Sequence, residues 1–186
     1  MKVKRVTKVE AQAYAKIKAD SASARDFLIK NGAKEKNLGI SPASITPIFK
    51  KEKGENTNQI EMYSATVAIS YSDSDVTNVA KIADKANELI ENGISITSTE
   101  PQYYYTKLED LKLSLIEKAA FNARERAERL TNGSNSKLGK ILSASQGIFQ
   151  ITRPLSNETS DWGMYDTSSC EKDVRCVVTV EFSVEK

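Results

Sequence analysis

The chain contains no histidine among its 186 residues. The commonest general base and metal ligand is therefore missing, and with it every Ser-His-Asp triad, Cys-His pair and histidine-ligated zinc site. The sequence also lacks a Gly-x-Ser-x-Gly motif, a Cys-x-x-Cys pair and a Walker motif. We therefore expect a protein that is not an enzyme and that uses no cofactor.

Two cysteines are the remaining candidates for thiol chemistry. Cys170 and Cys176 are six residues apart, and in a straight strand their sulfurs would lie ~20 Å apart. A disulfide therefore requires a turn at residues 171–173. Alternatively, Cys176 is a small buried hydrophobic residue within an apolar run. A catalytic thiol would need a neighbouring cation, but Arg175 would point to the opposite face of a strand.

Four carboxylates near the C-terminal end could in principle bind calcium. They are Asp161, Asp166, Glu171 and Asp173. Their spacing has none of the order of an EF-hand loop, so we expect no metal site.

Two groups of aromatic residues could form a partner site. Tyr103, Tyr104 and Tyr105 are consecutive, so in a strand they cannot all face one core; they either fill core and surface together or contact another subunit. Trp162, Met164 and Tyr165 lie in a long polar loop, where they either dock a partner or cap the sheet.

The balance of positive and negative residues disfavours one class of binding partner, nucleic acids. The 27 Lys and Arg residues nearly balance the 25 Asp and Glu residues, and the two signs are interleaved, which disfavours nucleic acid. There is no apolar run long enough to span a membrane, and the charged start lacks the apolar core of a signal peptide. A chain from which a leader had been removed would look the same, so we expect membrane association only through an N-terminal leader or anchor outside this sequence.

The periodicity of apolar residues predicts the elements that position these groups. Helices are predicted at residues 75–92, with Gly93 after the end, and at about 107–131, with a shorter one at 22–31. On the long helix, we expect a sheet-facing stripe of Leu113, Ile116, Ala120, Ala123, Ala127 and Leu130.

Strands are predicted between these helices. Their ranges are 12–19, 40–51, 59–71, 94–106, 139–151 and 174–184. Pro42 and Pro47 favour an edge position for the second of them, and the loop 53–58 joins it to the third. We expect an α+β fold whose largely antiparallel sheet is backed by helices on one face, with an element order that suggests two related α/β halves.

One segment resembles a known family. The helical run carries Ala119, Ala123, Arg124, Arg126, Ala127, Glu128 and Leu130, and the strand after it carries Leu138, Gly139, Lys140, Leu142 and Ser143. This pattern resembles the SIMPL domain family of bacterial envelope proteins. Relative to that family, a strand and half a helix are missing near residues 21–25. The alanines and Gly139 could record close packing alone, or Arg124 and Lys140 could bind an anion.

The resemblance implies a single domain over residues 1–186, with halves at about 1–72 and 73–186 and a loop at 152–173. It also implies a periplasmic or envelope location, a homo-oligomer and a link to oxidative-stress defence without a known catalytic step. Two other interpretations remain open. One is a monomeric peptide- or ligand-binding module that uses the edge segment 40–51, and the other is a hydrolase based on carboxylates and tyrosine.

Overall fold

A computed structural model describes residues 1–97 and 99–186 of the chain. The chain divides into two compact units, Met1–Pro101 (unit 1) and Gln102–Lys186 (unit 2), and each is described by itself. The division falls after Pro101, whereas the sequence placed the junction of two related halves at residue 72. Helix and strand each make up 35% of the residues and the sheets are largely antiparallel, so the predicted α+β class is confirmed.

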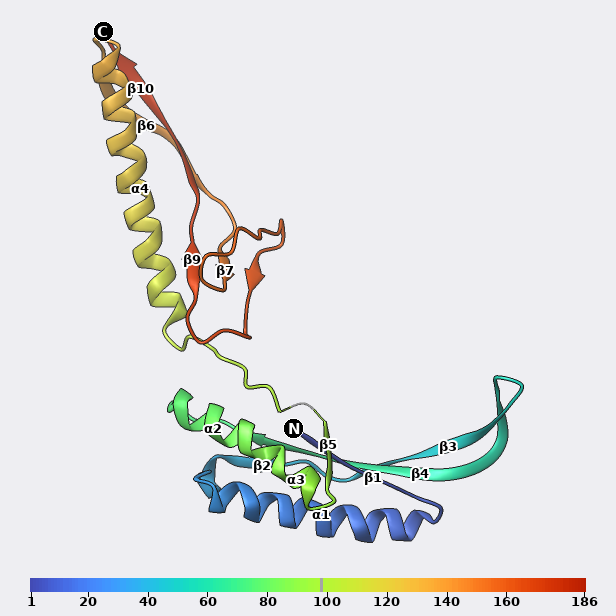
Figure 1. The fold of residues 1–186 in the computed structure, drawn as a ribbon. Helices are drawn as coiled ribbons and strands as arrows, with labels where there is room; N and C mark the ends of the chain where they lie inside the picture. Colours follow the sequence, from blue (N-terminus) through green and yellow to red (C-terminus); the bar gives the residue numbers. More distant parts are fainter. Residues whose placement is uncertain (98) are drawn as a thin grey trace. The chain divides into compact units, whose positions relative to one another are not determined.

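Unit 1 is a sheet packed against helices. Its elements are β1 (Lys2–Thr7), α1 (Glu10–Lys30), a 3-10 helix (Glu35–Asn37), β2 (Leu38–Ile40), β3 (Ser44–Glu52), β4 (Glu55–Tyr71), α2 (Val76–Ala86), α3 (Glu88–Glu91) and β5 (Ser95–Thr97). The strand order is β2-β4-β1-β5, and β3 also pairs with β4. All of these pairings are antiparallel. Figure 1 shows α1 running along the sheet and the β3–β4 hairpin extending beyond the helices.

The core of unit 1 follows from the alternation of β4 and the periodicity of its helices. Ala65, Val67 and Ile69 are buried on one face of β4, while Ala68, which lies between the last two, and Ser70, which follows them, are exposed. From the helices, the buried residues are Ala13, Ile17, Ala24 and Leu28 of α1, Ile82 and Ala86 of α2, and Leu89 of α3. One continuous apolar cluster therefore joins the helices to the sheet.

The strand predicted at 12–19 is wrong, because these residues belong to the helix α1. The helix predicted at 22–31 is confirmed through Lys30, but it is the second half of α1, which begins at Glu10. Its buried residues are Ala13, Ile17, Ser21, Ala24 and Leu28, at intervals of four, four, three and four. That is the repeat of one helical face, carried by small residues that give a weak apolar signal.

The hairpin predicted at 40–71 and the helix predicted at 75–92 are both present, but each differs in detail. The strands β3 and β4 continue to a two-residue turn in which both Lys53 (φ 53°) and Gly54 (φ 89°) have positive φ, so the long loop predicted at 53–58 is wrong. The edge position of β3 is confirmed, because among the described residues β3 pairs with β4 alone. The helix predicted at 75–92 is divided at Asn87 into α2 and α3, with Asp75 as its N-cap and Gly93 (φ 74°) after its end.

Unit 2 is built on one long helix and a two-stranded ribbon. Its elements are α4 (Leu108–Gly133), β6 (Lys137–Gln146), β7 (Gln150–Thr152), β8 (Met164–Tyr165), β9 (Asp173–Arg175) and β10 (Val178–Glu185). The strands β6 and β10 pair antiparallel, and α4 lies beside them (Figure 1). A second small sheet has the order β8-β7-β9, with β7 and β8 parallel.

The long helix is confirmed, but its predicted stripe is only partly right. Ile116, Ala123 and Ala127 are half-buried, whereas Ala120 is exposed and Leu113 and Leu130 are 69% and 76% exposed. Only a two-stranded ribbon accompanies a helix of 26 residues, so few of its apolar positions have anything to pack against.

The strands predicted in unit 2 are shorter than expected. The range 139–151 is divided between β6 and β7, and the range 174–184 between β9 and β10. Along β10, the alternate residues Val178, Val180 and Phe182 are half-buried, whereas Val184, beyond the register shifts around Phe182, is 61% exposed. Of the strand predicted at 94–106, only β5 is present; residue 98 lies outside the described residues, and residues 101–105 are not in a strand.

Candidate functional site

The structure brings the predicted aromatic residues of unit 2 together around one pocket. The pocket has a volume of about 530 Å³. Its lining consists of Leu108, Lys112, Gln146, Gly147, Ile148, Phe149, Ile151, Trp162, Gly163, Met164 and Tyr165. The first two residues come from α4, the next five run from the end of β6 into β7, and the last four lie at β8. This volume is in the range of small-molecule sites.

The tyrosine run contributes through one member. Tyr104 stacks on Tyr165 with ring centroids 6.1 Å apart. Tyr103 is half-buried and its amide donates to the Thr167 carbonyl at 2.8 Å, while Tyr105 is 50% exposed. Tyr104 therefore contacts the aromatic loop, although no local pattern in the sequence connects the two groups.

Hydrogen bonds hold the loop in place. The side-chain amide of Gln150 donates to the Ser160 carbonyl at 2.7 Å and accepts from the Ser160 amide at 3.3 Å. The parallel pairing of β8 with β7 then places Met164 opposite Gln150 and Tyr165 opposite Ile151. These hydrogen bonds and the strand pairing together fix this side of the pocket.

Gly163 allows the loop to approach the end of β6 closely. Its φ is +85°, and a Cβ at this position would lie 2.8 Å from Ile148 Cγ2 and 3.1 Å from the Phe149 carbonyl oxygen. Both the backbone conformation and the space exclude a larger residue. Gly163 therefore fixes how Trp162 and Met164 enter the pocket lining.

Lys112 supplies the charge of the pocket. Its Nζ lies 5.8 Å from the centre of the Phe149 ring, within the range of a cation–π contact, and donates to Glu109 Oε1 at 2.8 Å. The Glu109 side chain is 82% exposed, so this ion pair is mostly in solvent and weak. No local signal in the sequence singles out Lys112, which is one of many charged residues on the long helix.

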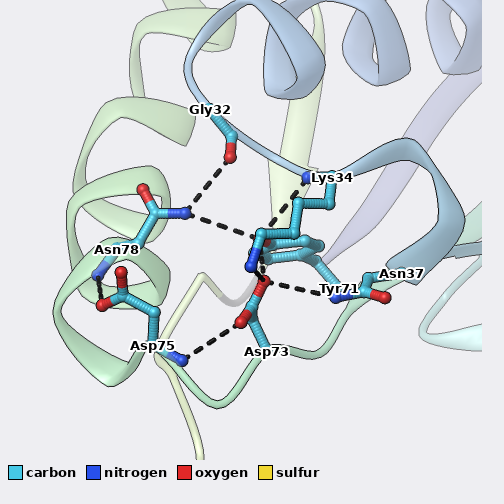
Figure 2. A network of polar contacts seen from close by, with 7 residues as sticks. All are labelled: Gly32, Lys34, Asn37, Tyr71, Asp73, Asp75 and Asn78. Carbon is cyan, nitrogen blue, oxygen red and sulfur yellow. Dashed lines mark hydrogen bonds and ion pairs between the residues drawn. The ribbon is translucent and has the colours of Figure 1, made fainter.

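A second polar cluster lies in unit 1, where the end of α1 meets the start of α2 (Figure 2). Its centre is the Asp73 carboxylate, whose side chain is 3% exposed. This carboxylate forms an ion pair with Lys34 at 2.9 Å and accepts from the Tyr71 hydroxyl at 2.9 Å and from the Asn37 side chain at 3.2 Å. The Asp75 amide donates to its other oxygen at 3.1 Å.

The same cluster extends to the N-terminus of α2. Asn78 donates from its side chain to the Gly32 carbonyl at 3.1 Å, and its amide donates to the N-cap Asp75 at 3.0 Å (Figure 2). The Lys34 ammonium, the Asp75 amide and the Tyr71 hydroxyl together hold the pKa of Asp73 well below its usual range. Burial and the bond to Asp73 raise the pKa of Tyr71. Each group has a partner, so this arrangement ties segments together rather than presenting a reactive group.

The residues of the family motif serve packing and pairing. A Cβ on Gly139 would lie 3.0 Å from the Ser183 carbonyl oxygen, so glycine permits the close approach of β10 to β6. Arg124 pairs with Glu128 one helical turn along at 2.9 Å, and the Lys140 amide donates to Ser183 at 2.9 Å. Ala119, Ala123, Ala127 and Leu138 are half-buried. These contacts favour the packing interpretation of the motif.

The structure does not bring the two cysteines and the four C-terminal carboxylates together in one site among the described residues. Cys170 is an exposed free thiol and Cys176 a half-buried one, with β9 between them in the sequence; burial raises the pKa of Cys176. Their disulfide stays a prediction. Asp166 accepts from Ser168 and Ser169, and Asp173 from the Leu155 amide. In the described part of the chain, no cluster of three or more such side chains is arranged to hold a metal ion.

None of the helices within residues 1–97 and 99–186 is both long and apolar enough to cross a membrane. The fold and these sites define a two-unit α+β protein with a packed polar tie in one unit and an aromatic pocket in the other. The model of the SIMPL family, described as a protein of unknown function (DUF541), matches residues 1–182. The chain belongs to this family, as its helix and strand motif predicted. A search of curated proteins found no match.

Proposed function

We propose that this SIMPL-domain protein is a non-catalytic component of the cell envelope that assembles into a homo-oligomer. The observation that carries the proposal is the uncovered apolar surface of unit 2. Ile141 and Leu142 are adjacent in β6 and are 59% and 69% exposed. Neighbouring strand residues point to opposite faces, so the ribbon presents apolar side chains on both of them.

Such a ribbon is a poor structure by itself. Two strands alone are marginally stable in water, and large exposed apolar patches usually mark an interface. Exposed positions around α4 add Leu113, Phe121 and Leu130, each more than 60% exposed. A second copy of the chain carries the same apolar surface and would cover it with matching chemistry.

The envelope location and the link to oxidative-stress defence rest on the resemblance described above. A non-catalytic role is supported by the lack of histidine in the sequence and by the fully paired carboxylate of Asp73. Fractionation of cells that produce the natural gene product tests the location, since an envelope protein leaves the cytoplasm.

Light scattering at several protein concentrations tests the assembly. We expect a mass that is a multiple of 20.5 kDa. Leu142→Glu should reduce this mass because it places a charge in the apolar surface, and Ser145→Glu is the matched control on an exposed polar position of the same strand. A wild-type chain that stays monomeric at high micromolar concentration would contradict the proposal.

The predicted contact residues are tested in the same way. Tyr103, Tyr104, Tyr105, Trp162, Met164 and Tyr165 stay the proposed aromatic contacts. Trp162→Ala combined with Tyr165→Ala should lower the assembled mass and leave the circular dichroism unchanged. If Leu142→Glu dissociates the assembly and the aromatic pair does not, the interface lies on the ribbon and the loop is not part of it.

One observation favours a second candidate, a monomeric module that binds peptides. The outer edge of β3 is unpaired among the described strands, and an extended peptide could add to it. Pro47 lacks an amide hydrogen and limits this pairing. A monomeric mass would support this candidate if the protein also binds peptides and the variant Phe49→Pro does not.

A further inference from the structure

We infer that the aromatic pocket of unit 2 binds an amphipathic anion, a small molecule with an apolar ring or chain that ends in a carboxylate. This inference goes beyond the proposed self-assembly, and it requires that the interface between copies lie on the β6–β10 ribbon and leave the Trp162 loop uncovered. It rests on the shape of the pocket, on its lining and on the position of a single cation.

The pocket is an open depression whose wall is largely apolar and whose size suits a small organic molecule. Its volume of about 530 Å³ suits a small organic ligand. Phe149 and Met164 line it, together with the aromatic rings of Trp162 and Tyr165. The Trp162 side chain is 94% exposed, a large apolar area left in water unless a ligand or partner covers it.

The charge of the pocket has one sign. Lys112 is the one charged residue among those described as lining it. Its Nζ is held near the Phe149 ring, so the cation sits beside the apolar wall and not at the end of a free side chain. A ligand with an apolar body over Phe149 and Trp162 would bring its carboxylate to this ammonium.

The competing carboxylate is Glu109. It accepts one hydrogen bond from Lys112, but an ammonium has three hydrogens to donate and Glu109 is 82% exposed. A ligand carboxylate less exposed to water would form the stronger pair, because screening is weaker there. The nearby Asp161 precedes Trp162 and does not line the pocket.

The loop that carries Trp162 is held by contacts of its own. The paired hydrogen bonds between Gln150 and Ser160 and the close approach at Gly163 fix the loop. A site that is formed in advance does not lose affinity to the ordering of its loop.

Trp162 is the only tryptophan of the chain, so its fluorescence reports on this pocket alone. We would titrate the protein with phenylbutanoate and, separately, with phenylbutanol, which has the same ring and chain and no charge. The acid should bind about tenfold more tightly than the alcohol, the effect of one added charge-assisted hydrogen bond. Lys112→Gln should remove this difference, and Lys118→Gln, an exposed residue of the same helix, should keep it.

The outcomes are decisive. Saturable binding of the acid with loss of the preference in Lys112→Gln alone supports the inference. Equal affinity for acid and alcohol in the wild-type protein, loss of the preference in both variants, or no saturable change in Trp162 fluorescence with either compound would overturn it. Circular dichroism checks that each variant is folded, and Lys112→Arg should restore the preference if charge is the cause.

Discussion

Unit 1 and unit 2 treat their apolar residues differently. Of the apolar side chains described as buried, all except Ile151 lie in unit 1, where they join α1, α2 and α3 to the sheet. In unit 2, α4 and the β6–β10 ribbon leave Leu130 76%, Leu142 69% and Trp162 94% exposed. No large apolar residue described in unit 1 is more than 55% exposed.

The cause lies in the number of layers that each unit can form. A five-stranded sheet with helices on it encloses a volume between two layers, so the alternating residues of β4 have something to face. A ribbon of two strands is too narrow to cover a 26-residue helix. Unit 1 therefore encloses an apolar core, whereas unit 2 leaves much of its apolar surface exposed.

The largest effect should come from the core of unit 1. Ile17 is fully buried, and Ile17→Ala should lower the free energy of unfolding by about 2 to 5 kcal/mol, because it leaves a cavity under the sheet. Leu130→Ala in unit 2 removes a side chain that is mostly in water and should change it by less than about 0.5 kcal/mol. Urea denaturation of the two variants measures both values. Similar losses in the two would mean that the units do not differ in burial as described.

An intermediate effect is expected within α4. Ala123 is half-buried against its unit, and Ala123→Leu should cost about 1 to 3 kcal/mol by overpacking. Ala120 has an exposed position three residues earlier, so Ala120→Leu is the control and should change the thermal midpoint little. If Ala120→Leu is as damaging as Ala123→Leu, the helix presents the whole face that its apolar periodicity predicted, and the difference in burial between these two positions is wrong.

The smallest effect concerns acid stability and compares one carboxylate from each unit. The pKa of Asp73 is lowered by Lys34 and that of Asp166 by the hydroxyls of Ser169 and Ser168. A carboxylate with a lowered pKa stabilises the fold at neutral pH. That contribution is lost as the pH falls below about 4, because the unfolded chain takes up its proton first.

The thermal midpoint of each variant, measured from neutral pH to pH 3, tests this comparison. Asp73→Asn and Asp166→Asn should each lower the midpoint at neutral pH and flatten its decline in acid. The Asp73 variant should show the larger change, because its side chain is 3% exposed against 19% for Asp166. A midpoint whose decline is as steep in both variants as in the wild type would show that neither carboxylate contributes.

The sequence alone determined the α+β class, the long helix, the edge strand with Pro47 and the family. Each depends on local rules: apolar period, the missing amide of proline, and a run of alanines before Leu138 and Gly139. The helix α1 could not be predicted from the local pattern. Its buried face consists mostly of small residues such as Ala13 and Ser21, so the helical period of apolar residues is weak.

Only the tertiary structure decided which apolar residues are covered and which polar groups meet. Leu113 and Leu130 have the same residue type and spacing as buried helix positions, but whether they are covered depends on the width of the sheet beside them. Asp73 meets Lys34 across 39 positions of the chain, and Tyr104 meets Tyr165 across 61, so no local pattern could announce either contact. Long-range proximity is a property of the folded backbone, and it is what turned separate aromatic residues into one pocket beside Lys112.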